Sequence, residues 1–182
     1  MEPTIFLFDP VERFVTGTVG EPGERTFFLQ ARTGNRLISV SIEKAQVAAL
    51  AERIAQIVKE VRVNEPLTVI DRVSSDDLAL ETPIDEEFRV GAIGLAFLAD
   101  RKLIEIDFRS IESGEGEVGE SFDITSSSNQ IILRVVISLG YAESFVKRSN
   151  AIIAAGRRPC PFCGGPIDPV GHLCPRANGY RR

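Results

Sequence analysis

The sequence predicts an α+β protein in which a largely antiparallel sheet carries two helices on one face and a small module rich in cysteine follows. Three observations support this class. Segments rich in β-branched and aromatic residues alternate with turn residues in both halves of the chain. Each set of such segments ends in a stretch with helical periodicity. All three cysteines and the single histidine then lie between positions 160 and 174.

The first forty residues contain the first set of predicted strands. Each segment is bounded by turn-forming residues. Residues 20–23 and 33–35 contain the glycines that hairpin turns favour. We therefore expect an antiparallel meander, whose strands are residues 4–8, 13–19, 26–31 and 37–41.

A long amphipathic helix is predicted from Glu43 to about Arg62. Its apolar residues recur at three- and four-residue steps, as in a helix that buries one face, and they are Val47, Leu50, Ala51, Ile54, Ile57, Val58 and Val61. After Pro66 comes a polar, acidic stretch with a possible short strand at residues 67–70, and this stretch ends near Glu87. It links the two halves of the chain.

The second half repeats the same plan. We expect strands at residues 88–98, 103–108 and 131–138, an acidic Gly/Ser-rich loop at 113–121, and a helix from about Tyr141 to Ala155. Phe145, Ile152 and Ile153 give this helix an apolar stripe. Gly156 is expected to cap its C-terminus, ahead of Pro159.

Strands followed by one helix thus occur twice, which suggests a duplicated unit formed by residues 1–63 and 87–156. The apolar positions of the two helices can be aligned, which pairs Val47, Ala51 and Ile54 with Phe145, Ser149 and Ile152. The alternative is that any two segments that run from sheet to helix look alike. In either case residues 1–156 are predicted to form one α+β domain, and residues 157–182 a separate tail.

The tail contains a pattern of metal ligands. Cys160 and Cys163 form a Cys-x-x-Cys pair followed by glycine, the geometry of a zinc knuckle, because both thiolates can converge on one ion. His172 and Cys174 are separated by one residue, so both side chains point to the same side of an extended segment. Three cysteines cannot all pair within one chain, which favours metal over disulfides. We predict one structural zinc ion per chain, bound by Cys160, Cys163, His172 and Cys174.

Three other roles for these cysteines fit the sequence less well. A redox pair of the glutaredoxin type requires a preceding strand and a following helix, whereas a helix is predicted before Cys160 and Gly-Gly-Pro follows Cys163. A zinc deaminase needs an upstream His-x-Glu, and no histidine precedes His172. A catalytic zinc usually has three protein ligands and an open position, whereas this tail offers four. A closed, structural shell is therefore favoured.

The tail is basic although the whole chain has a net charge of −5. The cations and the aromatic residue beside the cysteines could bind phosphate or stack on a base; they are Arg157, Arg158, Arg176, Tyr180, Arg181 and Arg182. The alternative is a solvated tail, or arginines that pair with the acidic loop. A net negative charge argues against extensive wrapping around nucleic acid, but it leaves a local anion-binding patch open.

Composition narrows the class of protein. Apolar residues make up 43% of the chain and charged residues 26%, which is typical of a soluble globular protein. No apolar run approaches the roughly 18 to 20 residues of a membrane helix, and the N-terminus lacks the basic region of a secretory signal. We therefore expect no membrane span and a cytoplasmic location.

Two further features could suggest catalysis. Residues 17–23 superficially resemble a phosphate-binding loop, but no helix and no lysine follow the glycines, so a hairpin turn is expected. Asp9 and Glu12 could be catalytic carboxylates, although the sequence identifies no partner for them.

Both ends of the chain resemble a known family. Residues 8–25 match the pattern FDPxERFVxGTVGxPGER, and residues 160–182 match CPxCGxPxxxxGHxCPRxNGYRR. These motifs resemble those of an uncharacterised family found chiefly in actinobacteria, which is known as a domain of unknown function. The resemblance implies no mechanism. It does imply a genomic setting near phosphatase-like and lipid-kinase-like proteins, and hence a link to phosphate chemistry.

Three functional hypotheses follow. The first is a non-enzymatic binding or adaptor protein whose basic tail contacts an anionic partner, such as nucleic acid or an acidic protein surface. The second is an enzyme that acts on a phosphorylated small molecule, in a cleft combining tail arginines with Asp9 or Glu12. The third is that zinc and tail lock the C-terminus onto the domain or onto a second subunit, so a homo-oligomer is possible.

Overall fold

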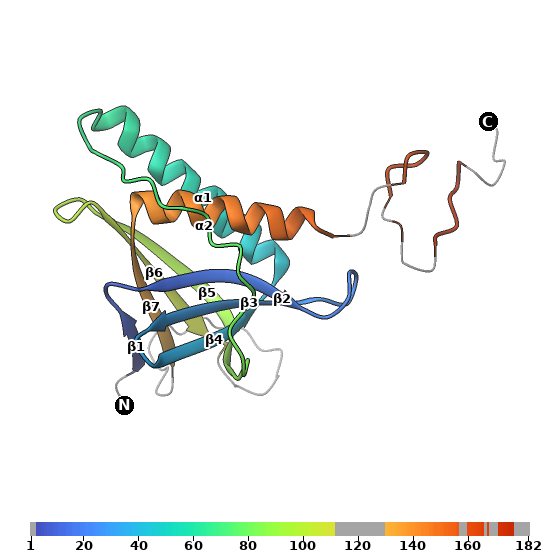
Figure 1. The fold of residues 1–182 in the computed structure, drawn as a ribbon, viewed down its shortest axis with the longest axis horizontal. Helices are drawn as coiled ribbons and strands as arrows, with labels where there is room; N and C mark the ends of the chain where they lie inside the picture. The colour runs from blue at the N-terminus through green and yellow to red at the C-terminus, as the bar shows by residue number, and fades with distance from the viewer. Residues whose placement is uncertain (1–2, 112–129, 157–159, 166, 168–170, 177–182) are drawn as a thin grey trace, which may run out of the picture.

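The computed structural model describes residues 3–111, 130–156, 160–165, 167 and 171–176. These residues form a seven-stranded sheet and two helices, so the predicted α+β class is confirmed (Figure 1). The strands are β1 (Thr4–Phe8), β2 (Arg13–Val19), β3 (Thr26–Thr33), β4 (Arg36–Ile42), β5 (Glu86–Leu98), β6 (Leu103–Ser110) and β7 (Ile131–Ser138). The helices are α1 (Lys44–Asn64) and α2 (Leu139–Ala154).

The sheet consists of two meanders joined by a parallel pair. Its strand order is β1-β7-β6-β5-β4-β3-β2. Strands β2 to β4 pair antiparallel, as do β5 to β7, and β4 lies parallel to β5. Each meander is followed by one helix, and both helices cover the same side of the sheet (Figure 1). Internal duplication and the domain boundary after residue 156 stay predictions.

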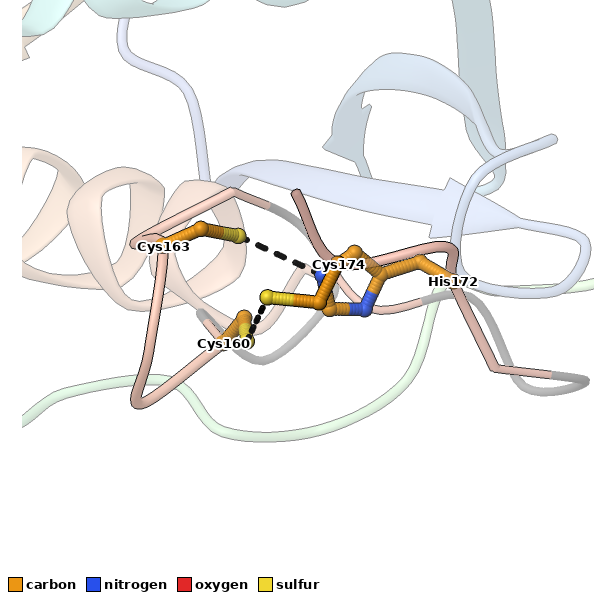
Figure 2. Close-up of side chains that lie close together, drawn as sticks. All are labelled: Cys160, Cys163, His172 and Cys174. Atoms are coloured by element: carbon orange, nitrogen blue, oxygen red, sulfur yellow. Dashed lines mark hydrogen bonds between the residues drawn. The ribbon is translucent and has the colours of Figure 1, made fainter. Parts of the chain in front are cut away.

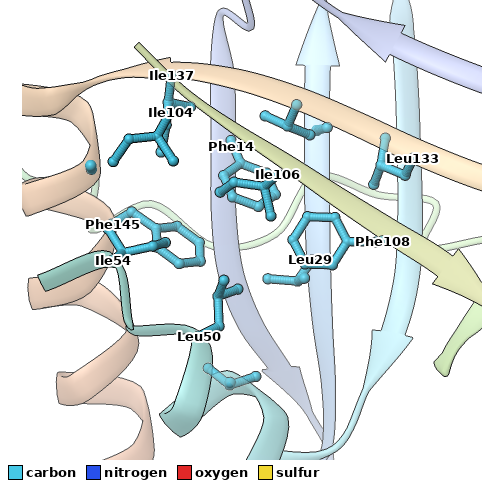
Figure 3. Packing of buried hydrophobic residues seen from close by; sticks show 14 of the residues in the cluster. Phe14, Leu29, Leu50, Ile54, Ile104, Ile106, Phe108, Leu133, Ile137 and Phe145 are labelled. Atoms are coloured by element: carbon cyan, nitrogen blue, oxygen red, sulfur yellow. The ribbon is translucent and has the colours of Figure 1, made fainter. Parts of the chain in front are cut away.

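The sheet curls strongly around its core. Phe14 of β2 and Phe108 of β6 lie four strands apart in the sheet order, yet their ring centroids are 5.8 Å apart. In a flat sheet, four spacings of about 4.8 Å would separate such strands by roughly 19 Å. Phe145 of α2 stacks on Phe14 at 4.7 Å and closes the core from the helix side, where Leu50 and Ile54 of α1 also pack (Figure 3).

The partner of β1 differs from the expectation. Residues 4–8 were predicted to join the first meander, but β1 lies parallel to β7, with Thr4 beside Ile131. The curl of the sheet also brings β1 close to β4. The guanidinium of Arg36 in β4 lies 5.3 and 5.0 Å from the ring centroids of Phe6 and Phe8 in β1. Side-chain alternation indicates that a segment is a strand, but it carries no information about a partner so distant in sequence.

Other local expectations were mostly correct. The turns at residues 20–23 and 33–35 connect β2 to β3 and β3 to β4, so the glycine-rich segment is a hairpin turn and not a phosphate loop. The predicted strand at residues 67–70 is wrong: no described strand pairs with it, and Leu67 and Val69 are 94% and 84% exposed. Leu67 and Val69 thus face water, whereas Ile70 packs against the core without joining the sheet.

The ends of the second helix are also corrected. Helix α2 starts two residues earlier than predicted, because Ser138 is its N-cap and its side chain accepts a hydrogen bond from the Tyr141 N–H at 3.2 Å. The residue at its C-cap is Ala155, not Gly156. The predicted acidic loop at residues 113–121 lies outside the described residues.

The connection from α1 to β5, residues 65–85, is held by buried polar contacts. Asp76 accepts two hydrogen bonds from Arg13, at 2.6 and 3.1 Å, and also contacts Arg148. Further along, Gln30 exchanges two hydrogen bonds with the backbone of Glu81, at 2.9 and 2.7 Å. The α1–β5 connection thus runs past α2 and over β2 and β3 as a fixed segment (Figure 1).

This close packing leads to a prediction at Gly140, in the first turn of α2. A Cβ atom at this position would lie 1.8 Å from the backbone oxygen of Asp71. Alanine is favoured over glycine in a helix by about 1 kcal/mol, so Gly140→Ala would stabilise the protein if space were available. We instead expect Gly140→Ala to lower the free energy of unfolding by about 1 to 3 kcal/mol, because the backbone at Asp71 must move to make room for the methyl group.

Urea denaturation of both proteins measures this effect. The matched control is Gly94→Ala, since a Cβ atom there meets only Asp107 Cβ at an ordinary 3.6 Å. Equal or greater stability of Gly140→Ala would show that the α1–β5 connection does not pack on α2 in this way.

Candidate metal centre

The four predicted ligands converge in the C-terminal module, by which we mean the described residues from Cys160 to Arg176. Their ligand atoms all lie within 4.8 Å of one another. Figure 2 shows the side chains of Cys160, Cys163, His172 and Cys174 pointing toward a common centre. All three cysteines are free thiols. The spacing in the sequence and the arrangement in space therefore agree.

Two of the six distances between ligand atoms can be compared with the edges of a tetrahedron around zinc, and both fit. A Zn–S bond of about 2.3 Å implies an S···S edge of about 3.8 Å, and a Zn–N bond of about 2.0 Å implies an S···N edge of about 3.5 Å. The sulfurs of Cys160 and Cys174 are 3.8 Å apart, and Cys163 Sγ lies 3.3 Å from His172 Nε2. Three soft thiolates and one imidazole in this arrangement could bind a metal such as zinc.

A tight turn positions the first two ligands. The Gly164 N–H donates to the Cys160 carbonyl at 2.8 Å, and the Cys160 N–H donates to the Gly165 carbonyl at 2.7 Å. Gly164 has a φ of 73°, a left-handed conformation in which side chains are disfavoured. The backbone N–H groups of Cys163 and Phe162 point at the Cys160 sulfur and lower the pKa of its thiol, which favours the thiolate that metals bind.

The surroundings of the site favour a structural role over a catalytic one. Cys160 and Cys174 are 5% and 6% exposed, and Cys163 and His172 are half-buried. Four protein ligands complete a tetrahedral shell and leave no position for a substrate. Residues 161–163 form a turn, and none of the described residues 164, 165, 167 and 171–176 is helical, so these residues do not provide the helix N-terminus that a redox pair requires.

The predicted anion-binding residues are only partly described. Arg176 is exposed, and its guanidinium donates a hydrogen bond to the Phe162 carbonyl at 3.2 Å. The other candidates lie outside the described residues, and they are Arg157, Arg158, Tyr180, Arg181 and Arg182.

Two exposed apolar residues in the module are not among the functional residues predicted from the sequence. Phe162 is 63% exposed and Leu173 is 88% exposed. A signal for both was available, because each lies between two ligands that turn inward: Phe162 in Cys-x-x-Cys and Leu173 in His-x-Cys. Side chains between converging ligands must point away from the metal.

The candidate catalytic carboxylates have ion-pair partners within the domain. Asp9 accepts two hydrogen bonds from Arg101, both at 2.7 Å, and these hydrogen bonds hold the pKa of Asp9 below its usual range. Glu12 accepts from Arg32 and from the Gly34 N–H, both at 3.0 Å. Both carboxylates precede β2, at the end of the sheet opposite the C-terminal module (Figure 1). The described residues therefore do not combine Arg176 with these carboxylates in one cleft.

The fold and the site together define an α+β protein with a C-terminal Cys₃His group that could hold a metal ion. The chain belongs to the family described as "Protein of unknown function (DUF3090)", whose model matches residues 6–174. The match includes all four candidate ligands. The search of curated proteins and the search of solved structures each find no match. No helix in the described part of the chain is long and apolar enough to cross a membrane.

Proposed function

We propose that this protein is a zinc-containing binding or adaptor protein whose basic tail contacts an anionic partner. The proposal rests mainly on the C-terminal module, which combines converging metal ligands with exposed side chains. Its four ligand atoms lie within 4.8 Å of one another, while Arg176 and Phe162 are exposed on the same module. A zinc ion bound there is structural, one per chain, and gives a short segment a defined shape.

The distribution of charge supports an anionic partner for the tail. Residues 157–182 contain five arginines and one aspartate, a net charge of +4, whereas the rest of the chain must then carry −9 to give the total of −5. An anion is attracted to the tail and repelled by most of the domain, so the charges orient it during the encounter.

The alternative is an enzyme that acts on a phosphorylated small molecule, with tail arginines as phosphate clamps. It would need an arginine of the tail and a carboxylate in one cleft. Asp9 and Glu12 are instead paired with Arg101 and Arg32, at the other end of the sheet. The binding function therefore has the better support.

A salt titration tests the proposal. Purified protein is expected to bind heparin, used as a general polyanion, with an affinity that falls linearly with salt on logarithmic axes. Arg176→Gln should weaken binding and reduce the slope. The matched control is Arg53→Gln, since Arg53 is an exposed arginine on α1 whose guanidinium also donates a local hydrogen bond, to Gln56 at 3.2 Å. Absent binding, or binding that salt does not weaken, would refute an anionic partner.

A further inference from the structure

A cavity lies at the end of the domain from which the tail departs. It has a volume of about 510 Å³ and lies between the β2–β3 hairpin, the start of α1 and the end of α2. Gly156, the last described residue before the tail, lines it. So do Arg25, Lys44 and Arg89, which are three cations from three separate parts of the chain.

Two of these cations lack a carboxylate partner among the described residues. Arg89 pairs with Glu43, and the other carboxylate of the cavity, Glu86, accepts a hydrogen bond from Ser41 at 2.8 Å. Arg25 instead donates to the Ile152 carbonyl at 3.4 Å and lies 5.5 Å from the Phe27 ring centroid, and its other N–H donors have no hydrogen-bond partner within the described part of the chain.

Lys44 completes this cationic surface. Within the described residues it has no ion pair or hydrogen bond from its side chain. A Cβ atom built on Gly156 would lie 3.4 Å from Arg25 Nη2 and 3.9 Å from Lys44 Nζ. The carbonyl end of α2 favours cations, which helps two of them to approach each other. The cavity thus holds three cations and two carboxylates, a surplus of positive charge where the basic tail begins, although the domain as a whole is acidic.

The C-terminal module adds a stacking group to these charges. Phe162 is 63% exposed, and its own carbonyl holds the guanidinium of Arg176 at 3.2 Å. An exposed aromatic ring beside a cation is the usual platform for an unpaired base, because stacking requires only a free face of the base. In a duplex both faces of each base are already stacked, so only a single strand can use this ring.

We propose that the anionic partner is single-stranded nucleic acid, whose phosphates contact Arg25 and Lys44 in the cavity and Arg176 on the module, while one base stacks on Phe162. This inference rests on the proposed function and narrows it to one class of partner. An acidic protein segment would satisfy the cations but would leave the aromatic ring without a role.

The test compares four fluorescent probes by anisotropy: a single-stranded RNA of mixed sequence, the same sequence as a duplex, heparin, and poly-glutamate. The zinc-loaded, full-length protein is expected to bind the single strand at least tenfold more tightly than the duplex or poly-glutamate. Single-stranded DNA is measured beside RNA to show which sugar is preferred.

Two sets of variants separate stacking from charge. Phe162→Ala should weaken binding of the single strand by about 5- to 150-fold, the range for one stacked base, with an unchanged salt slope. Phe162→Tyr should retain affinity. The Arg25→Gln/Lys44→Gln double variant should instead reduce the slope by about 1.4, which is roughly 0.7 for each phosphate contact with a single strand. Leu67→Ala is the control for removing an exposed apolar side chain elsewhere, and it should bind like the wild type.

The outcomes distinguish this inference from the proposed function. If heparin binds in a salt-dependent way but Phe162→Ala binds the single strand like the wild type, the inference is wrong and the proposed function stands. Tighter binding of poly-glutamate than of the single strand has the same meaning, and it identifies an acidic protein as the partner. If none of the four probes binds, the proposed function fails and the inference fails with it. A wild-type salt slope in the double variant would overturn the role of the cavity.

Discussion

Replacing Cys163 by serine is expected to remove the zinc ion that we propose for the C-terminal module. A structural zinc site needs all four ligands, and apparent binding energies of about 10 to 16 kcal/mol in small zinc modules show how much order the metal supplies. The hydrogen bonds described for Cys160, Gly164 and Arg176 all join residues of the module to one another.

Metal content by mass spectrometry measures this effect. We expect one zinc per wild-type chain and none in Cys163→Ser, together with faster alkylation of Cys160 and Cys174, which are buried in the wild type. Melting curves of both proteins show whether the loss also destabilises the domain. Phe162→Ala is the matched control, because it changes an exposed side chain between the same two cysteines and should keep the metal. A wild-type protein without zinc would refute the site and would reopen the redox role of the cysteines.

Asp76→Ala is expected to destabilise the domain strongly, because its carboxylate pairs with two arginines. The Arg13 and Arg148 side chains are both only 9% exposed, and Asp76 is the carboxylate that contacts the two of them. Its removal leaves Arg148 without a carboxylate partner among the described residues and Arg13 with Glu81 alone, at 3.3 Å, and it weakens the attachment of the α1–β5 connection. Because Asp76 is itself 26% exposed, we expect a loss of about 2 to 4 kcal/mol rather than the larger value of a fully buried pair.

The matched control is Asp77→Ala, which removes the same charge from the neighbouring, exposed position and should cost less than about 0.5 kcal/mol. Urea denaturation of the three proteins gives the comparison. Equal stability of the two variants would show that the ion pairs of Asp76 with Arg13 and Arg148 contribute nothing measurable to the free energy of unfolding.

The pH dependence of stability gives a second measure of the same ion pairs of Asp76. The hydrogen bonds from Arg13 hold the pKa of Asp76 below its usual range. A carboxylate with a lowered pKa in the folded state stabilises the protein at any pH above its unfolded pKa of about 3.9, and this contribution disappears as the pH falls below that value. Wild type and Asp76→Ala should therefore converge in stability as the pH is lowered below about 4.

The candidate metal site was the most predictable part of the protein. Cys-x-x-Cys and His-x-Cys each place two ligands together through local backbone geometry, and the structure brings both pairs within bonding range of one ion. The exposure of Phe162 follows from the same local geometry. The convergence of Arg25 and Lys44 on Gly156 does not, because these residues are far apart in sequence and only the packing of the hairpin, α1 and α2 brings them together.

The sequence by itself determined where the strands and helices lie, the turns between β2, β3 and β4, and the set of four ligands, because all of these depend on residues a few positions apart. Tertiary structure alone decided that β1 pairs with β7, that the sheet curls until Phe14 meets Phe108, and that residues 67–70 form no strand. It also decided that Asp76 lies between Arg13 and Arg148. Such long-range contacts depend on which surfaces meet when the chain folds. The periodicity of one segment does not specify which distant segment it contacts.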